Sequence, residues 1–170
     1  MLGVFAAFWG FTGICLLFAS AIYRLGSMAL EMPLNSFAWY HWLALIACLA
    51  FMGFAEGYRG FQQNFSPRVA ARIRYLQQHV TPLRALLAPL FCMGFFHAQK
   101  RRQIVTFCLT GGIIALVLLV RLLEQPWRGI IDAGVVLGLS WGIVSLAVFT
   151  LRAFTDPGFD CSPETPVEPG

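Results

Sequence analysis

Apolar residues in this chain are gathered into long runs separated by short polar stretches. A helix needs roughly 20 apolar residues to cross the hydrocarbon core of a bilayer, because it rises about 1.5 Å per residue. The runs that reach this length cover residues 2–22, 37–58, 104–123 and 130–150. Lipid offers backbone groups no hydrogen-bonding partner, so each run is expected to be helical. The pattern predicts an all-α polytopic membrane helix bundle with four long transmembrane helices.

A further apolar segment, residues 82–98, is short and is interrupted by Pro89. Two topologies stay open for it, a short re-entrant helix or a fifth span. The Lys and Arg residues beside the helix ends favour four spans, because short cytoplasmic loops carry the excess of positive charge. With four spans, one side of the membrane holds Arg59, Arg68, Arg72, Arg74, Arg84, Lys100, Arg101, Arg102 and Arg152, and the other holds Arg24, Arg121 and Arg128. Both termini are then expected to be cytoplasmic.

Residues 66–80 predict an amphipathic helix on the membrane surface. Ser66 supplies a capping hydroxyl and Pro67 suits the first helical position. An apolar stripe recurs behind them with helical spacing, at Val69, Ile73, Leu76 and Val80. The basic residues of the opposite surface, Arg68, Arg72 and Arg74, are candidate contacts for anionic lipid headgroups. An anionic ligand or a partner protein is the alternative for these arginines.

Glu56 and Arg59 lie three residues apart at the end of the second apolar run. They would meet on one face if this helix continues through Gly57. The simpler interpretation is an ion pair at the interface, worth about 1 kcal/mol or less. The alternative is a carboxylate that takes up a proton or a cation, because ionisable groups at membrane depth usually have a function.

A second group of charges surrounds the turn before the last apolar run. Its members are Arg121, Glu124, Arg128 and Asp132. Asp132 follows Arg128 by four residues, so the two side chains can pair on one helix face. A structural charge cluster and an ion-binding or transport site are both compatible with this pattern.

The last apolar run carries two overlapping GxxxG repeats, formed by Gly134, Gly138 and Gly142. Small residues four apart allow another helix to approach closely, which is how helices associate in lipid. The partner of this glycine face can be another span of the chain, a second copy in a homo-oligomer, or a different membrane protein.

Composition agrees with a bilayer location. The chain is 58% hydrophobic and 12% charged, with a mean hydropathy of +0.71, which is more apolar surface than a soluble domain of this size can bury. Residues 1–154 are expected to form one membrane domain, and residues 155–170, acidic and rich in proline, a disordered tail. No soluble domain could present the basic face to nucleic acid.

No motif for a metal, a cofactor or a soluble-type catalytic site stands out. The five cysteines form no CxxC pair and most lie inside apolar runs, where they are expected to be small buried hydrophobic residues. His41 and His97 could share a haem only if the chain had five spans.

Three strings carry a resemblance to a known family: EGYRGFQQNFSPRVAARI, LLAPLFCMGFFHA and QPWRGIIDAGVVLGLSWG. The chain resembles, from about Tyr23 to Phe149, a family of small integral membrane proteins of bacteria with relatives in cyanobacteria and plastids. That family has no assigned activity, so the resemblance implies a shared architecture and no catalytic residue. It places the chain in a bacterial inner membrane and hints at energy-transducing membranes.

The functional hypotheses therefore fall into different classes. The leading one is a non-enzymatic accessory, assembly or scaffold component that packs through the glycine face and is oriented by anionic lipid. The alternative is a small transporter or channel that uses Glu56, Arg59, Arg128 and Asp132 along an aqueous path. An enzyme acting on lipid comes third.

Overall fold

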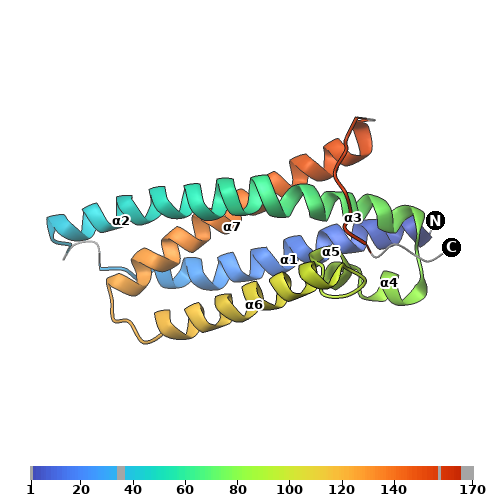
Figure 1. The fold of residues 1–170 in the computed structure, drawn as a ribbon. Coiled ribbons are helices and arrows are strands. Elements are labelled where there is room, and N and C mark those ends of the chain that lie inside the picture. The colour runs from blue at the N-terminus through green and yellow to red at the C-terminus, as the bar shows by residue number, and fades with distance from the viewer. Residues whose placement is uncertain (1, 34–36, 157, 166–170) are drawn as a thin grey trace.

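The computed structural model describes residues 2–33, 37–156 and 158–165 of the chain. These residues form an all-α bundle, which confirms the predicted fold class. The helices are α1 (Leu2–Leu30), α2 (Trp39–Met52), η2 (Gly53–Phe65), α3 (Ser66–Gln78), α4 (Pro82–Leu86), α5 (Ala88–Met93), α6 (Lys100–Val120) and α7 (Trp127–Thr155). Figure 1 labels α1 to α7, and η2 lies between α2 and α3.

In the described residues, four helices are long and apolar enough to cross a membrane, as the apolar runs predict. Residues 82–98 do not form a fifth one. They fold into α4 and α5, of five and six residues, and end at Gly94, which takes the left-handed conformation that stops a helix. Helices this short cannot cross about 30 Å of hydrocarbon, so the five-span alternative is wrong.

The second span does not end where the sequence predicts. α2, η2 and α3 form one continuous helix of 40 residues, from Trp39 to Gln78, drawn in cyan to green in Figure 1. Its middle part, η2, is a π-helix of 13 residues. Such helices are usually single turns inside an α-helix and are frequent at functional sites. The helix predicted at residues 66–80 is present as α3, but it continues the second span instead of forming a separate helix.

Ser66 and its neighbours explain this difference. The Ser66 hydroxyl does not cap a helix; it contacts the hydroxyl of Ser145 on α7, and both residues are buried. The apolar stripe behind it is also buried, with Val69, Ile73 and Leu76 inside the core of the protein. An amphipathic helix can lie on a membrane or pack against a bundle, and here the bundle takes its apolar face.

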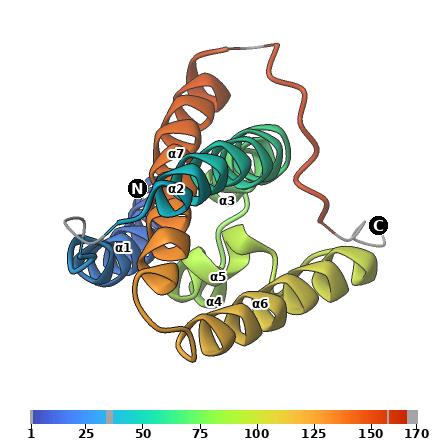
Figure 2. The same ribbon diagram turned by 90° about the vertical axis from the view of Figure 1, so that its left-hand side faces the viewer.

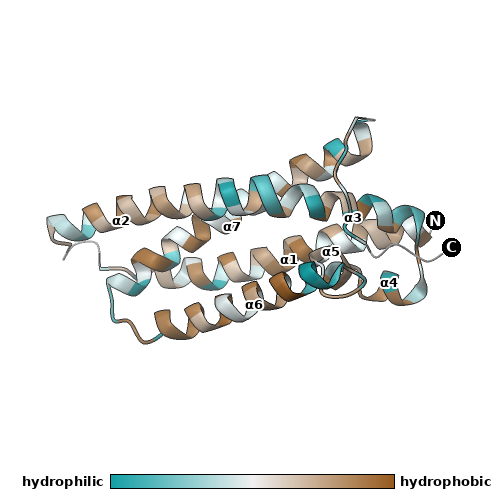
Figure 3. Cartoon of the chain, viewed as in Figure 1, coloured by the Kyte–Doolittle hydropathy of each residue, from teal (hydrophilic) through white to brown (hydrophobic). Residues whose placement is uncertain are grey.

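The chain runs back and forth, so that α1 and α6 begin, and α3 and α7 end, at the same end of the bundle (Figure 1). We call this end, which holds α3, α4, α5 and the first turn of α6, the arginine end. Hydrophilic segments lie on η2, α3, α4 and the start of α6, whereas most of α7 and the rest of α6 are apolar (Figure 3). The opposite end, with the α6–α7 turn, is called the turn end.

The buried core lies between α1, α3, α5 and α7. Its largest fully buried side chains include Ile14, Ile73, Leu76, Phe91 and Leu146. Small residues of α1 allow the short helix α5 to approach closely: a Cβ added at Gly10 would lie 3.0 Å from the Cys92 sulfur. This contact holds α5 against the bundle although the helix has fewer than two turns.

Helix α6 stands apart from the other long helices, and Figure 2 shows it along one side of the bundle with α4 and α5 between. Only Thr106 and Val120 of this helix are buried. After α7 the chain turns back toward the start of α6 (Figure 2), so residues 158–165 pass over the arginine end.

Candidate functional site

Arg72 is the most buried charged residue of the arginine end, with 3% of its surface exposed. Its guanidinium donates hydrogen bonds to main-chain carbonyls only: Nη1 to Phe91 at 2.6 Å, Nε to Pro163 at 2.8 Å, and Nη2 to His97 and Glu164 at 3.3 Å each. These carbonyls belong to the end of α5, the loop before α6 and the segment after α7. Arg72 therefore joins three parts of the chain.

The contact with lipid headgroups predicted for Arg72 is thus wrong. Its guanidinium is hydrogen-bonded to four carbonyls inside the protein and does not face lipid. Arg68 and Arg74, the other two predicted headgroup contacts, are both half-buried on α3. Arg68 donates to the Asn64 side chain at 3.1 Å, and its Nε lies 3.9 Å from the Glu164 carboxylate. The lipid contacts expected for Arg68 and Arg74 stay a prediction.

Glu164 brings a second arginine to the same place. Its carboxylate lies 3.6 Å from Nε of Arg102, in the first turn of α6. The main-chain N–H of Gln99 also donates to the Glu164 carbonyl, at 3.1 Å. The segment 158–165, which the sequence assigns to a disordered tail, is therefore attached to α3 and α6 at Glu164. Thr155 and Asp156 of that predicted tail end α7, and residues 157 and 166–170 lie outside the described residues.

Two thiols near the arginine end are not activated. Burial raises the pKa of the Cys92 thiol to about 12, although the nearby Arg72 acts in the opposite direction. Burial also raises the pKa of the Cys161 thiol, against the effect of Arg68. Both cysteines stay protonated at neutral pH, so neither is suited to nucleophilic catalysis.

Glu56 lies on η2, half-buried against α7. A Cβ added at Gly138 would be 2.9 Å from Oε2 of Glu56. No ion pair joins Glu56 to Arg59 in the described part of the chain, although the helix continues through Gly57 as the pairing requires. The π-helix is the reason, because its i→i+5 hydrogen bonds put more residues into each turn and residues three apart no longer align.

The charged group at the turn end is only partly assembled. Arg128 and Asp132 form an ion pair, with Nε 3.8 Å from Oδ2, and Asp132 is 4% exposed. Oδ2 has no hydrogen-bond partner among the described residues. Arg128 also contacts the Met28 sulfur of α1 at 2.9 Å. Arg121 and Glu124 are exposed and form no ion pair in the described ranges, so the expected convergence of four charges reduces to one pair.

The glycine face of α7 is covered by the same chain. A Cβ added at Gly134 would lie 2.8 Å from the Cys48 sulfur, and one at Gly142 would lie 2.9 Å from the Phe61 ring. Gly57 of η2 approaches Trp141 in the same way, at 3.0 Å. Among the partners left open by the sequence, the structure places α2 and η2 on this face.

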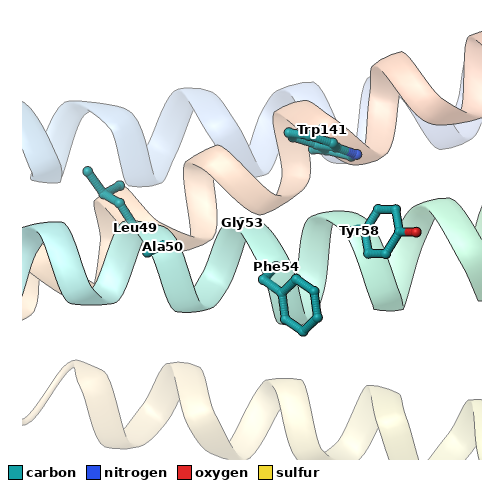
Figure 4. A pocket seen from close by; sticks show the side chains of 6 residues that line it. All are labelled: Leu49, Ala50, Gly53, Phe54, Tyr58 and Trp141. Atoms are coloured by element: carbon teal, nitrogen blue, oxygen red, sulfur yellow. The ribbon is translucent and has the colours of Figure 1, made fainter.

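An apolar groove of about 430 Å³ runs between the second span and α7. Figure 4 shows the residues that line it: Leu49, Ala50, Gly53, Phe54, Tyr58 and Trp141. The Trp141 indole N–H donates to the Gln62 side chain at 2.9 Å, which fixes the ring at the groove edge. A groove without charged side chains suits a hydrocarbon chain and not an ion.

Metal and haem binding receive no support from the geometry. No three His, Cys, Asp or Glu side chains come together as metal ligands within residues 2–33, 37–156 and 158–165. His41 begins α2 at the turn end and His97 precedes α6 at the arginine end, so this pair cannot hold one haem.

Searches for related proteins identify no known function for this arrangement. No protein-family model, curated protein or solved structure matches the chain. The resemblance to small bacterial and plastid membrane proteins is therefore carried by the three sequence strings alone and stays a prediction. The arginine end, with its buried Arg72, is the feature that sequence reasoning missed, because nothing in the sequence shows that residues 163 and 164 return to α3.

Proposed function

We propose that this integral membrane protein is a non-enzymatic accessory or scaffold component of a membrane complex, and that it docks through α6. The observation that carries the proposal is the pair Gly111 and Gly112. A Cβ added at either glycine would meet nothing within 4 Å. Glycine inside a helix costs up to about 1 kcal/mol relative to alanine, and no contact with the described residues offsets that cost.

The packing of the other long helices supports this choice of helix. α7 packs against α1, α2, η2 and α3, and α1 also packs against α3, whereas α6 buries only Thr106 and Val120. Helices associate in lipid through small residues that permit close approach. A helix with two adjacent glycines and no neighbour at their level therefore fits a partner helix from another membrane protein.

The arginine end supports an orientation for the complex. Lys100 and Arg101 are exposed at the start of α6, and Arg68 and Arg74 lie on α3 of the same end. Basic residues beside membrane helices are attracted to anionic headgroups and are retained on the cytoplasmic side. We therefore assign this end, and both termini, to the cytoplasmic face of a bacterial inner membrane.

The transporter alternative is less well supported by the geometry. It requires that Glu56, Arg59, Arg128 and Asp132 line one aqueous path. Glu56 packs on Gly138, whereas Asp132 is buried beside Arg128 and α1 at the turn end. The groove beside η2 is lined by apolar and aromatic residues instead of charges. We expect Glu56→Gln and Asp132→Asn to leave ion flux into proteoliposomes unchanged.

The docking proposal is tested by replacing a glycine with leucine on α6. Protein is extracted from its native membrane in a mild detergent. Light scattering then gives the protein mass of each particle after the bound detergent has been subtracted. We expect wild type to exceed the 18.9 kDa of one chain and Gly112→Leu to return to that mass. Gly26→Leu on α1 is the matched control, because Gly26 also has nothing within 4 Å.

A wild-type mass of one chain, or an unchanged mass in Gly112→Leu, would contradict docking through α6. The exposed Cys108 on α6 identifies the occupant. Crosslinking from its thiol should yield an adduct that contains a different membrane protein. A product of two identical chains joined at Cys108 would show instead that a second copy covers α6.

A further inference from the structure

Three arginines from two helices surround one carboxylate at the arginine end. Arg68 and Arg102 approach Glu164 from α3 and α6, at 3.9 and 3.6 Å. Arg72 lies beneath them and binds the carbonyls of Pro163 and Glu164. Three like charges in one place are held only if an anion compensates them, and in the described structure that anion is Glu164.

The site is built into the fold. Arg72 is 3% exposed and is fixed by the Phe91 carbonyl of α5 at 2.6 Å. Gly94 brings the backbone close to the arginines: a Cβ there would lie 3.8 Å from Nη1 of Arg72 and 3.9 Å from the Arg102 side chain. The Phe91 and His97 carbonyls hold Arg72 independently of residues 163 and 164, and the Gly94 turn lies beside both Arg72 and Arg102.

Glu164 is an incomplete partner for this site. Charge-assisted N–H···O bonds measure about 2.7–2.9 Å, and arginine pairs best with two oxygens at once. Both distances to Glu164 are longer than this. Glu164 also has φ of 49°, in the left-handed region that is unfavourable for a residue with a Cβ. An anion that comes closer to Arg68 and Arg102 can therefore displace the Glu164 carboxylate.

We propose that Arg68 and Arg102 bind the phosphate group of an anionic phospholipid, and that Glu164 occupies this site as an intramolecular competitor. Arginine binds a phosphate through two parallel N–H···O bonds as it binds a carboxylate, and a lipid phosphate is not tied to the backbone of this segment, so its two charged oxygens can approach both guanidinium groups. Binding of the phosphate releases the segment 158–165 from α3 and α6. This site is separate from the proposed docking face of α6 at Gly111 and Gly112.

The surroundings favour a phospholipid over a free phosphate. Exposed apolar side chains continue from the site along α4 and α5, at Leu83, Leu86 and Leu90, and along α6, at Ile104 and Phe107. The arginines lie where a membrane-spanning helix begins. A ligand that combines an anionic phosphate with hydrocarbon chains would contact both kinds of surface.

Native mass spectrometry of the full chain in detergent tests the site with phosphatidylglycerol as the probe. Glu164→Gln removes the competing charge and should raise the fraction of lipid-bound protein about tenfold, the effect of about 1.4 kcal/mol. Asp160→Asn is the matched control, since Asp160 lies in the same segment and forms no ion pair with the described residues. Arg102→Gln should lower phosphatidylglycerol binding.

Two further binding measurements define the chemical class of the ligand. Phosphatidylcholine with the same acyl chains should bind more weakly and show no response to Glu164→Gln. Inorganic phosphate should not displace phosphatidylglycerol at millimolar concentration. Displacement by inorganic phosphate would show that the site takes free phosphate and would overturn the lipid assignment. Equal binding of lipid to wild type, Glu164→Gln and Arg102→Gln would overturn the site itself.

Cys161 reports the position of the segment independently. Its thiol is partly buried, and burial raises its pKa, so release of the segment should lower the pKa and speed alkylation at pH 8. Peptide-resolved thiol labelling should show faster Cys161 modification in Glu164→Gln and in wild type with phosphatidylglycerol. Lipid binding without any change at Cys161 would contradict the competition between the lipid and Glu164.

Discussion

The Arg72 side chain meets Phe91 in two ways, with Nη1 2.6 Å from the Phe91 carbonyl oxygen and the guanidinium carbon 5.1 Å from the centre of its ring. One residue of α3 thus satisfies a helix-end carbonyl of α5 and stacks on an aromatic ring of the core. Because α5 has only six residues, this contact fixes a helix that could not form alone.

Arg72→Lys is expected to lower the free energy of unfolding by about 3 kcal/mol. An ammonium group has three donors on a flexible chain and cannot reach four carbonyls arranged around a planar guanidinium group. Thermal unfolding in detergent measures the loss. Arg74→Lys is the control, since Arg74 is half-buried on the same helix and makes no hydrogen bond in the described ranges. Equal unfolding temperatures for the two variants would contradict a structural role of Arg72.

The close approach of α7 to the second span predicts opposite effects at two glycines. Gly142→Ala should destabilise the protein by about 1–3 kcal/mol, because the new methyl group would lie 2.9 Å from the Phe61 ring. Gly26→Ala should be neutral or stabilising by up to about 1 kcal/mol, since nothing lies within 4 Å of its added Cβ. Both effects are measured as changes in unfolding temperature. A Gly142→Ala protein as stable as wild type would argue against the packing of η2 on α7.

The buried pair of Arg128 and Asp132 predicts unequal losses of stability when either residue is replaced. Arg128→Gln leaves the Asp132 carboxylate without a cation and should cost about 3 kcal/mol. Asp132→Asn leaves a partly exposed Arg128 and should cost about 1 kcal/mol or less. The double variant should therefore be more stable than Arg128→Gln alone in a double-mutant cycle. A double variant as unstable as the sum of both changes would show that the two residues do not interact.

The four-span topology predicts which surface positions share a side of the membrane. Single cysteines at Gln78, Gln99 and Glu124, all exposed, are placed in a cysteine-free background and labelled with an impermeant thiol reagent in oriented vesicles. Positions 78 and 99 should label from the cytoplasmic side and position 124 from the other. Labelling of 78 and 99 from opposite sides would contradict the position of α4 and α5.

The spans follow directly from the sequence, because bilayer thickness sets a length that only long apolar runs reach. The end of the second span does not, since Ser66–Pro67 is an ordinary helix start and only the tertiary contact with Ser145 shows that the helix continues. The π-helical hydrogen bonding of η2 also has no sequence signal, so the alignment of Glu56 with Arg59 is expected from α-helical spacing and is absent.

The candidate site was less accessible to sequence reasoning for a different reason. Arg68 and Arg72 are separated from Glu164 by more than half of the chain, and a proline-rich acidic segment has the composition of a disordered tail. The sequence shows the basic face of residues 66–80, but it does not show which of these arginines the rest of the protein covers.

The first turn of α1 lies against the last turn of α3, so that a Cβ added at Gly3 would overlap the Gln77 carbonyl. At this level α1 exposes Leu2, Val4 and Phe5, whereas α3 and its neighbours carry arginines. We therefore expect lipid to meet an apolar surface beside α1 and a charged surface beside α3. A bilayer adjusts its thickness to the apolar surface it meets, and we expect the leaflet to be thinner beside α3 than beside α1.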